Sequence, residues 1–127
     1  MIDDDKLVLK NYIEDLRRFK LNSPVIYSGF FYDADQIARE NIQGKIIEIQ
    51  SKQALGITTA ELFWKDSTNI IHTWSTLSDY LVFLQNLAIL IAERGTQLYA
   101  TAWSKKAEVE ALTAITEVVT YDVNAGW

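Results

Sequence analysis

An uncharged apolar run from Tyr80 to Ala92 is the feature that most constrains how this chain folds. Apolar residues recur at spacings of three and four along the wider stretch from Leu77 to Trp103, which predicts one face of a helix. Other apolar residues in the run point away from that face, so the helix must be buried on most of its sides. Either the remaining segments of the 127-residue chain wrap this helix, or another protein covers the sides that they leave exposed.

The same run is too short to predict a membrane span. It has 13 residues, whereas a helix needs about 20 apolar residues to cross a bilayer. A longer span would place Asp79, Glu93 and Arg94 in the hydrocarbon, which is energetically costly. We therefore predict no membrane insertion, and a membrane-acting protein that inserts Tyr80–Ala92 is a weaker alternative.

The composition indicates one folded domain, with or without a helical extension. Hydrophobic residues make up 49% of the chain, which is enough for a sizeable core. The formal net charge is −5, and basic residues cluster no further than pairs such as Arg17-Arg18, so we expect no nucleic-acid partner. The chain contains no cysteine, which excludes disulfides, thiolate metal sites and cysteine nucleophiles.

Residues 1–24 are predicted to form an N-terminal amphipathic helical arm. The acidic residues Asp3 to Asp5 suit the N-terminus of a helix over residues 4–20. Pro24 ends the helix, because proline disfavours the helical conformation in the residue before it. The arm either docks on a partner or folds back on the core of the same chain. Its apolar face consists of Leu9, Tyr12, Ile13, Leu16 and Phe19.

Residues 25–127 are predicted to form an α+β domain. The β-prone segment from Val25 to Tyr32 predicts two short strands or one bent strand around Gly29. A helix follows, with Asp33 as its predicted cap and Gly56 as its end.

A β-hairpin is predicted over residues 58–74, with its turn at Asp66-Ser-Thr. The long apolar helix begins after it and is expected to continue to Leu112, with Ser104 as a candidate break. A short helical turn follows Thr113. These elements together predict a mostly helical α+β fold with an N-terminal helix, short strands, a β-hairpin and one long central apolar helix.

Few residues in the sequence point to chemistry. His72 is the only histidine, and its sequence neighbours include no carboxylate or nucleophile that would make a catalytic pair. Asp33 and Asp35 could ligate a metal from a loop, but helix capping explains them better. No phosphate-binding loop, nucleophile elbow or zinc motif is present. We therefore predict that the protein is not an enzyme and has no catalytic residue, cofactor or metal site.

Four segments of the chain, taken in order, resemble those of a known family. They are Tyr32-Asp-Ala-Asp35 followed by Ala38-Arg39 and Asn41-Ile42; Phe63-Trp64 with Asp66 and Asn69, then Leu77; an apolar helix ending in Arg94, Tyr99 and Lys106; and the C-terminal Tyr121-Asp122-Val123-Asn-Ala-Gly-Trp127. Over residues 25–127 the chain resembles a domain found near the C-terminal ends of tail-fibre and tail-fibre assembly proteins of tailed bacteriophages.

The resemblance implies a non-enzymatic phage tail protein that associates with tail fibres or the baseplate. Two roles fit: an assembly chaperone that shields apolar fibre segments until they trimerise, or a small structural adaptor that stays in the tail. The implied location is the phage virion tail, or the host cytoplasm during assembly. The resemblance also implies a homo-oligomer, with a homotrimer matching the symmetry of fibres.

The residue pattern independently favours an interaction module, because the long helix is apolar on most sides and aromatic residues are enriched at interfaces. One alternative is a small glycan-active phage enzyme, which requires Asp33, Asp35 or His72 to converge in one pocket. Another is a membrane-acting phage protein. The predicted partner-binding residues are Leu9, Tyr12, Ile13, Leu16 and Phe19 on the arm, and those of Val82, Phe83, Ile89 and Leu90 that the fold leaves uncovered.

Overall fold

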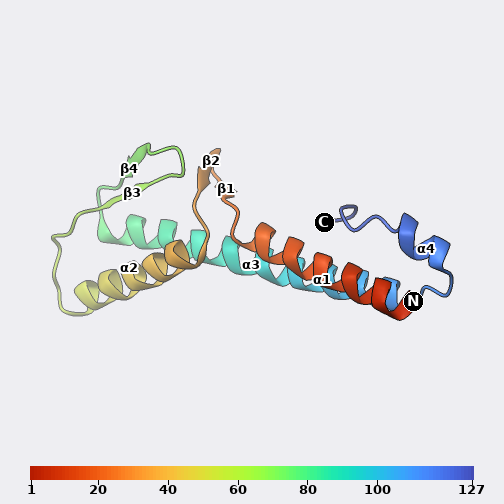
Figure 1. Cartoon of the computed structure of the whole chain (residues 1–127). Helices are drawn as coiled ribbons and strands as arrows, with labels where there is room; N and C mark the ends of the chain where they lie inside the picture. Colours follow the sequence, from red (N-terminus) through yellow and green to blue (C-terminus); the bar gives the residue numbers. More distant parts are fainter. The chain divides into compact units, whose positions relative to one another are not determined.

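The computed structural model describes residues 1–127 and confirms a mostly helical α+β fold (Figure 1). Its elements, in order, are α1 (Ile2–Leu21), β1 (Val25–Tyr27), β2 (Phe30–Tyr32), α2 (Gln36–Ala54), β3 (Phe63–Lys65), β4 (Ile71–Thr73), α3 (Leu77–Glu110) and α4 (Ile115–Thr120). Helix α3 contains the predicted apolar run and continues without interruption through Ser104, so the candidate break at that residue is wrong.

The chain divides into two compact units, and helix α3 contributes to both. The first unit joins residues 1–21 to residues 94–127, and the second holds residues 22–93. This division differs from the boundary predicted at residue 24, because α1 lies in one unit with residues 94–127.

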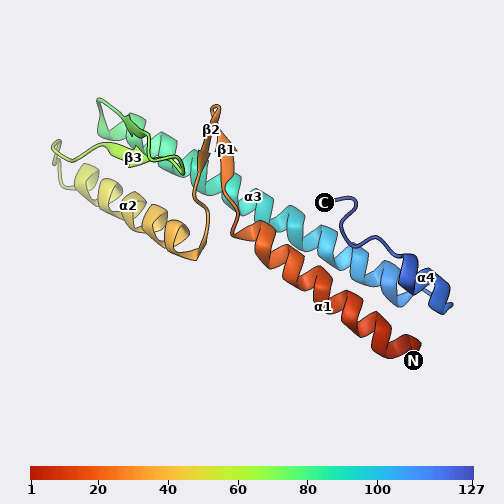
Figure 2. The same cartoon turned by 45° about the horizontal axis from the view of Figure 1, so that its top comes forward.

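In the unit of residues 22–93, α2 runs alongside the first half of α3 (Figures 1 and 2). Strands β1 and β2 form a hairpin whose turn holds Ser28 and Gly29 at φ values of 50° and 83°. Such left-handed turns match the twist of the flanking strands. Strands β3 and β4 form the second hairpin, in which Trp64 lies opposite His72.

The core of this unit gathers around α3. Tyr80 is fully buried, and its hydroxyl donates a hydrogen bond of 2.7 Å to the carbonyl of Phe63. This burial raises the pKa of the Tyr80 phenol to about 12. The buried cluster consists of Val25, Tyr32, Ala34, Ile42, Ile46, Ile49, Leu77, Tyr80, Phe83, Leu84, Leu87 and Ile91.

Helices α2 and α3 are each capped at the N-terminus by a short polar side chain. Asp35, and not the predicted Asp33, caps α2, because its carboxylate accepts a hydrogen bond of 2.8 Å from the amide of Ala38. Thr76 caps α3 by accepting a bond of 3.1 Å from the amide of Asp79. Helix α2 ends before Gly56, which has a φ of 71°, a conformation that glycine adopts without strain.

In the unit of residues 1–21 and 94–127, α1 lies along the second half of α3 (Figures 1 and 2). Ile13 is fully buried in a small core with Ala102 and Val109. The guanidinium of Arg94 donates a hydrogen bond of 2.6 Å to the carbonyl of Leu21 at the end of α1. The N-terminal helix therefore folds back on its own chain, which was one of the two alternatives left open by the sequence.

No helix of the chain combines the length and apolar character that a membrane span requires.

Candidate functional site

The apolar face predicted for the N-terminal arm is divided between the core and the surface. Ile13 is fully buried, and Leu9 and Leu16 pack partly buried against the same core. Tyr12 is 48% exposed and Phe19 is 72% exposed. These two residues are seven apart and so lie near one line along the helix. Only Tyr12 and Phe19 of the five predicted residues therefore offer substantial area to a partner.

The four residues predicted on the long helix are divided in the same way. Phe83 is buried and Leu90 packs partly buried against the core. Val82 and Ile89 are each 55% exposed and are also seven residues apart. These two positions form the apolar strip that the fold leaves uncovered on α3.

A larger exposed aromatic pair on α3 was not among the predicted partner-binding residues. Tyr99 is 59% exposed and Trp103 is 66% exposed. Their rings pack edge to face, with centroids 6.2 Å apart. A tryptophan exposed to this extent is unusual in a folded protein, and the spacing of four residues from Tyr99 to Trp103 would have identified the pair as neighbours on a helix.

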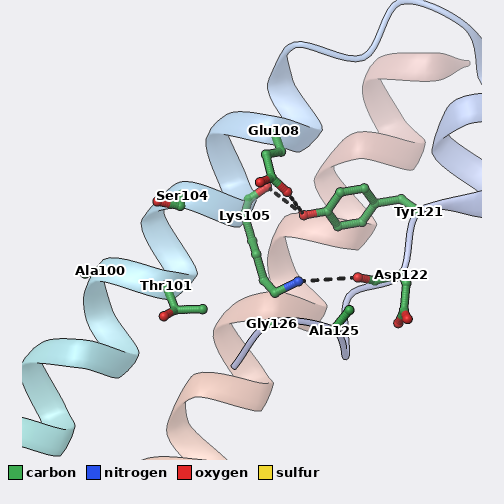
Figure 3. A pocket seen from close by; sticks show the side chains of 9 residues that line it. All are labelled: Ala100, Thr101, Ser104, Lys105, Glu108, Tyr121, Asp122, Ala125 and Gly126. Atoms are coloured by element: carbon green, nitrogen blue, oxygen red, sulfur yellow. Dashed lines mark hydrogen bonds between the residues drawn. The ribbon is translucent and has the colours of Figure 1, made fainter.

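A pocket of about 540 Å³ lies between α3 and the C-terminal tail (Figure 3). The amine of Lys105, a residue only 7% exposed, donates a hydrogen bond of 3.3 Å to the carbonyl of Asp122. The same amine lies 5.5 Å from the ring centre of Tyr121 and 6.0 Å from that of Trp127. The cation is therefore held by the tail of its own chain through a carbonyl and two aromatic faces.

Two further hydrogen bonds hold the C-terminal tail, one inside this pocket and one beside it. The Tyr121 hydroxyl donates a hydrogen bond of 2.7 Å to the carboxylate of Glu108. Burial and the negative charge of Glu108 raise the pKa of the Tyr121 phenol well above its usual range. Trp127 donates a bond of 2.7 Å from its indole nitrogen to the carbonyl of Val123. The bonds from Lys105 to Asp122 and from Tyr121 to Glu108 therefore join the tail to α3.

A histidine–carboxylate pair lies in the second hairpin. The Nε2 atom of His72 is 2.9 Å from a carboxylate oxygen of Asp66, which is only 3% exposed. The other oxygen accepts bonds from the amide and hydroxyl of Thr68 and from the amide of Ile70. Burial by itself would raise the pKa of Asp66, but the bonds from His72 and the turn outweigh it and lower the pKa to about 2. The sequence neighbours of His72 gave no sign of this partner, because Asp66 is six residues away along the chain.

The ring of His72 also lines a second pocket, which we call the aromatic pocket. It has a volume of about 450 Å³, and six of its nine lining residues carry aromatic rings when the imidazole is included. Its lining residues are Tyr27, Ser28, Phe30, Tyr32, His72, Trp74, Asp79, Val82 and Phe83. All of them belong to the unit of residues 22–93.

The residues considered for an enzyme do not form one constellation. Asp35 is engaged in capping α2, and the carboxylate partner of His72 is Asp66. Of Asp33, Asp35 and His72, only His72 lines the aromatic pocket. No three histidine, aspartate or glutamate side chains lie close enough together to hold a metal ion.

A family model described as a domain of unknown function, DUF4376, matches residues 5–125. The chain belongs to the DUF4376 family. Neither the curated proteins nor the solved structures include a match to it. In this DUF4376 chain, each of the four segments that resemble the phage domain contains a residue whose contact stabilises the fold. Asp35 caps a helix and Asp66 accepts the hydrogen bonds of a turn. Lys106 forms an ion pair with Glu14, and Trp127 donates a hydrogen bond to the tail.

Proposed function

We propose that this DUF4376 chain is a non-enzymatic bacteriophage tail protein that binds a tail-fibre or baseplate polypeptide. It acts as a fibre-assembly chaperone or as a small structural adaptor of the tail. Its location is then the virion tail, or the host cytoplasm during assembly. The phage assignment is supported by the four ordered segments that resemble the domain of tail-fibre and fibre assembly proteins.

The exposed pair of Tyr99 and Trp103 is the observation that most supports protein binding. Tryptophan and tyrosine are enriched among the residues that dominate binding energy at protein interfaces. The pair lines a shallow depression of about 160 Å³ together with Glu14, Arg17 and Lys106. Apolar rings bordered by charged groups correspond to the usual anatomy of an interface, with an apolar centre and a polar rim.

Affinity purification from phage-infected cells tests the proposal. We expect the tagged chain to enrich a fibre or baseplate protein, identified by mass spectrometry. The Trp103→Ala variant should enrich the same protein at least tenfold less, because loss of a buried aromatic contact costs about 2 kcal/mol or more. A matched control is Leu55→Ala, which removes an exposed apolar side chain in the other unit. Equal enrichment by both variants would refute the assignment to Trp103, and no tail protein in any sample would refute the function.

Purified virions distinguish the two roles. A structural adaptor is present in intact particles at a fixed ratio to the fibre protein. A chaperone is present in infected cells and absent from particles. Quantitative mass spectrometry of both fractions measures this ratio.

We further propose that the chain forms a homo-oligomer, with a homotrimer as the expected state. The exposed apolar positions Tyr12, Phe19, Val82 and Ile89 supply surface that association would cover. Light scattering of the purified chain gives its mass directly. A stable monomer at all concentrations would contradict this proposal. The exposed apolar positions would then be assigned to contact with a different protein.

A further inference from the structure

The aromatic pocket has no part in the proposed contact through Tyr99 and Trp103, and its chemistry favours a particular ligand. We propose that it binds an organic ammonium group, either the alkylammonium of a lysine side chain or a quaternary ammonium such as that of choline. The arrangement of the rings and the charge of the lining support this ligand, whatever partner binds at Tyr99 and Trp103.

The rings of the pocket hold one another in place. Trp74 is stacked on Phe83, with ring centres 4.3 Å apart, and Tyr27 meets Phe83 edge to face at 5.7 Å. Phe30 meets the His72 ring edge to face at 4.5 Å. Each ring is carried by a hairpin or by α3 or its N-terminal flank, so the site is formed before a ligand arrives. A preformed site of about 450 Å³ is within the usual range for small-ligand pockets.

The charge of the lining is negative. Asp79 is the only acidic residue of the lining, and no lysine or arginine lines the pocket. The backbone amide of Asp79 is bonded to Thr76, while its carboxylate makes no hydrogen bond or ion pair. Aromatic faces add partial negative charge, and cations are attracted to them when they lie within about 6 Å of a ring centre. An ammonium group matches both features.

The N-terminus of α3 opposes this charge only in part. A helix N-terminus carries about half of a positive charge, whereas the Asp79 carboxylate carries a full negative charge. The imidazole of His72 lies against the buried carboxylate of Asp66, so no unpaired basic group faces the pocket from this strand. The balance at the pocket therefore remains favourable to a cation and unfavourable to an anion.

A neutral sugar is the main competing ligand, because sugar rings also stack on aromatic side chains. One face of Trp74 is already covered by Phe83, which limits stacking of a sugar and approach of a cation alike. A sugar would also bind irrespective of ligand charge. A comparison of ligands with equal shape and different charge therefore separates the two possibilities.

Titrations of the full-length chain followed by NMR provide the test. The indole N–H signal of Trp74 reports the pocket, and the other three tryptophans serve as internal references. The probes are choline, its neutral isostere 3,3-dimethylbutanol, n-butylammonium as the lysine mimic, and methyl glucoside. We expect saturable shifts of Trp74 with choline or n-butylammonium at concentrations up to roughly 50 mM, which would saturate a millimolar site. The stronger of these two ligands identifies the source of the ammonium group.

Two variants test the mechanism of binding. Asp79→Asn keeps the shape of the side chain and should weaken ammonium binding roughly three- to tenfold, because it removes the attracting charge. Phe30→Leu keeps an apolar side chain at a position that is 40% exposed and should also weaken it by removing an aromatic face. Glu61→Gln, at an exposed position of the same unit outside the pocket, should leave the affinity unchanged. Melting temperatures confirm that each variant is folded.

Three results would overturn the proposal. The first is no shift of Trp74 with either ammonium probe. The second is equal binding of 3,3-dimethylbutanol and the stronger ammonium probe, which would assign the pocket to neutral apolar groups, or stronger binding of methyl glucoside, which would assign it to sugars. The third is an unchanged affinity of the Asp79→Asn variant for both ammonium probes.

Discussion

The amine of Lys106 lies 2.7 Å from a carboxylate oxygen of Glu14, and this ion pair joins α3 to α1 across 92 residues of sequence. The other oxygen of Glu14 accepts a bond of 2.5 Å from the guanidinium of Arg17. Hydrogen bonds from Arg17 and Lys106 lower the pKa of Glu14 from 4.5 to about 2. The carboxylate therefore bridges a cation on its own helix and a cation on the neighbouring helix.

We predict that Glu14→Gln lowers the free energy of unfolding at neutral pH by about 1–2 kcal/mol, because it removes two charge-assisted bonds at a partly exposed site. A carboxylate with a lowered pKa stabilises the fold above its unfolded pKa of 4.5, and this contribution is lost as the pH falls toward 2. The variant should therefore lose less stability than the wild type over this interval. Urea denaturation at several pH values measures both effects. Asp15→Asn on the same helix is the control, and equal acid sensitivity of the wild type and Glu14→Gln would contradict the prediction.

The carboxylate of Asp66 should stabilise the turn of the second hairpin. We predict that Asp66→Ala lowers the melting temperature and accelerates amide hydrogen exchange at Thr68 and Ile70, because both amides lose their acceptor. The pKa of Asp66 is lowered to about 2, so this contribution is present above its ordinary value of 3.8 and is lost as the pH falls through 2. The exposed Asp33→Asn variant should leave both amides protected. Unchanged exchange in Asp66→Ala would show that the turn holds without its carboxylate.

Alanine substitutions at two glycines should change the free energy of unfolding in opposite directions. Gly44 lies inside α2, and nothing lies within 4 Å of the position that a Cβ atom would occupy. We predict that Gly44→Ala stabilises the chain by about 0.5–1 kcal/mol, since alanine has the higher helix propensity. Gly56 is equally open but has a φ of 71°, so Gly56→Ala should destabilise by about 1 kcal/mol or more. Chemical denaturation of both variants measures the difference, and a change of the same sign in both would contradict the explanation.

The C-terminal tail should detach when its terminal ring is removed. We predict that Trp127→Ala accelerates hydrogen exchange at Asn124, because the variant loses the bond to Val123 and the ring beside Lys105. The expected cost is about 1 kcal/mol for the hydrogen bond, with an added loss from the exposed ring surface. Trp103→Ala is a matched control, since it removes an exposed tryptophan from the same unit. Faster hydrogen exchange at Asn124 in Trp103→Ala, and not in Trp127→Ala, would contradict the role of Trp127 in holding the tail.

Local signals predicted most of the elements correctly. The predicted helix over residues 4–20 is observed at Ile2–Leu21, and the predicted long apolar helix is observed at Leu77–Glu110. The cap of α2 was assigned to Asp33 instead of Asp35, because Gln36 lies three residues after Asp33, which is the spacing of a capping box. The choice between them depends on where the chain leaves β2.

The pair of Asp66 and His72 was missed for a different reason. The two residues are six apart and meet only because of the register that places Trp64 opposite His72. A hairpin register depends on the turn and on which strand face is buried. Sequence spacing alone identified both residues but not their contact.

The sequence by itself determined that the run from Tyr80 to Ala92 is helical and needs cover, because periodicity and hydrophobicity are properties of neighbouring residues. Only the tertiary structure decided which sides are covered. Ile13 is buried and Tyr12 is exposed although both are apolar neighbours, and Lys105 is buried although it stands in a basic pair with Lys106. Burial depends on how segments from distant parts of the chain pack against one another, and that packing buries Tyr80 and Leu87 of α3 while it leaves Tyr99 and Trp103 exposed.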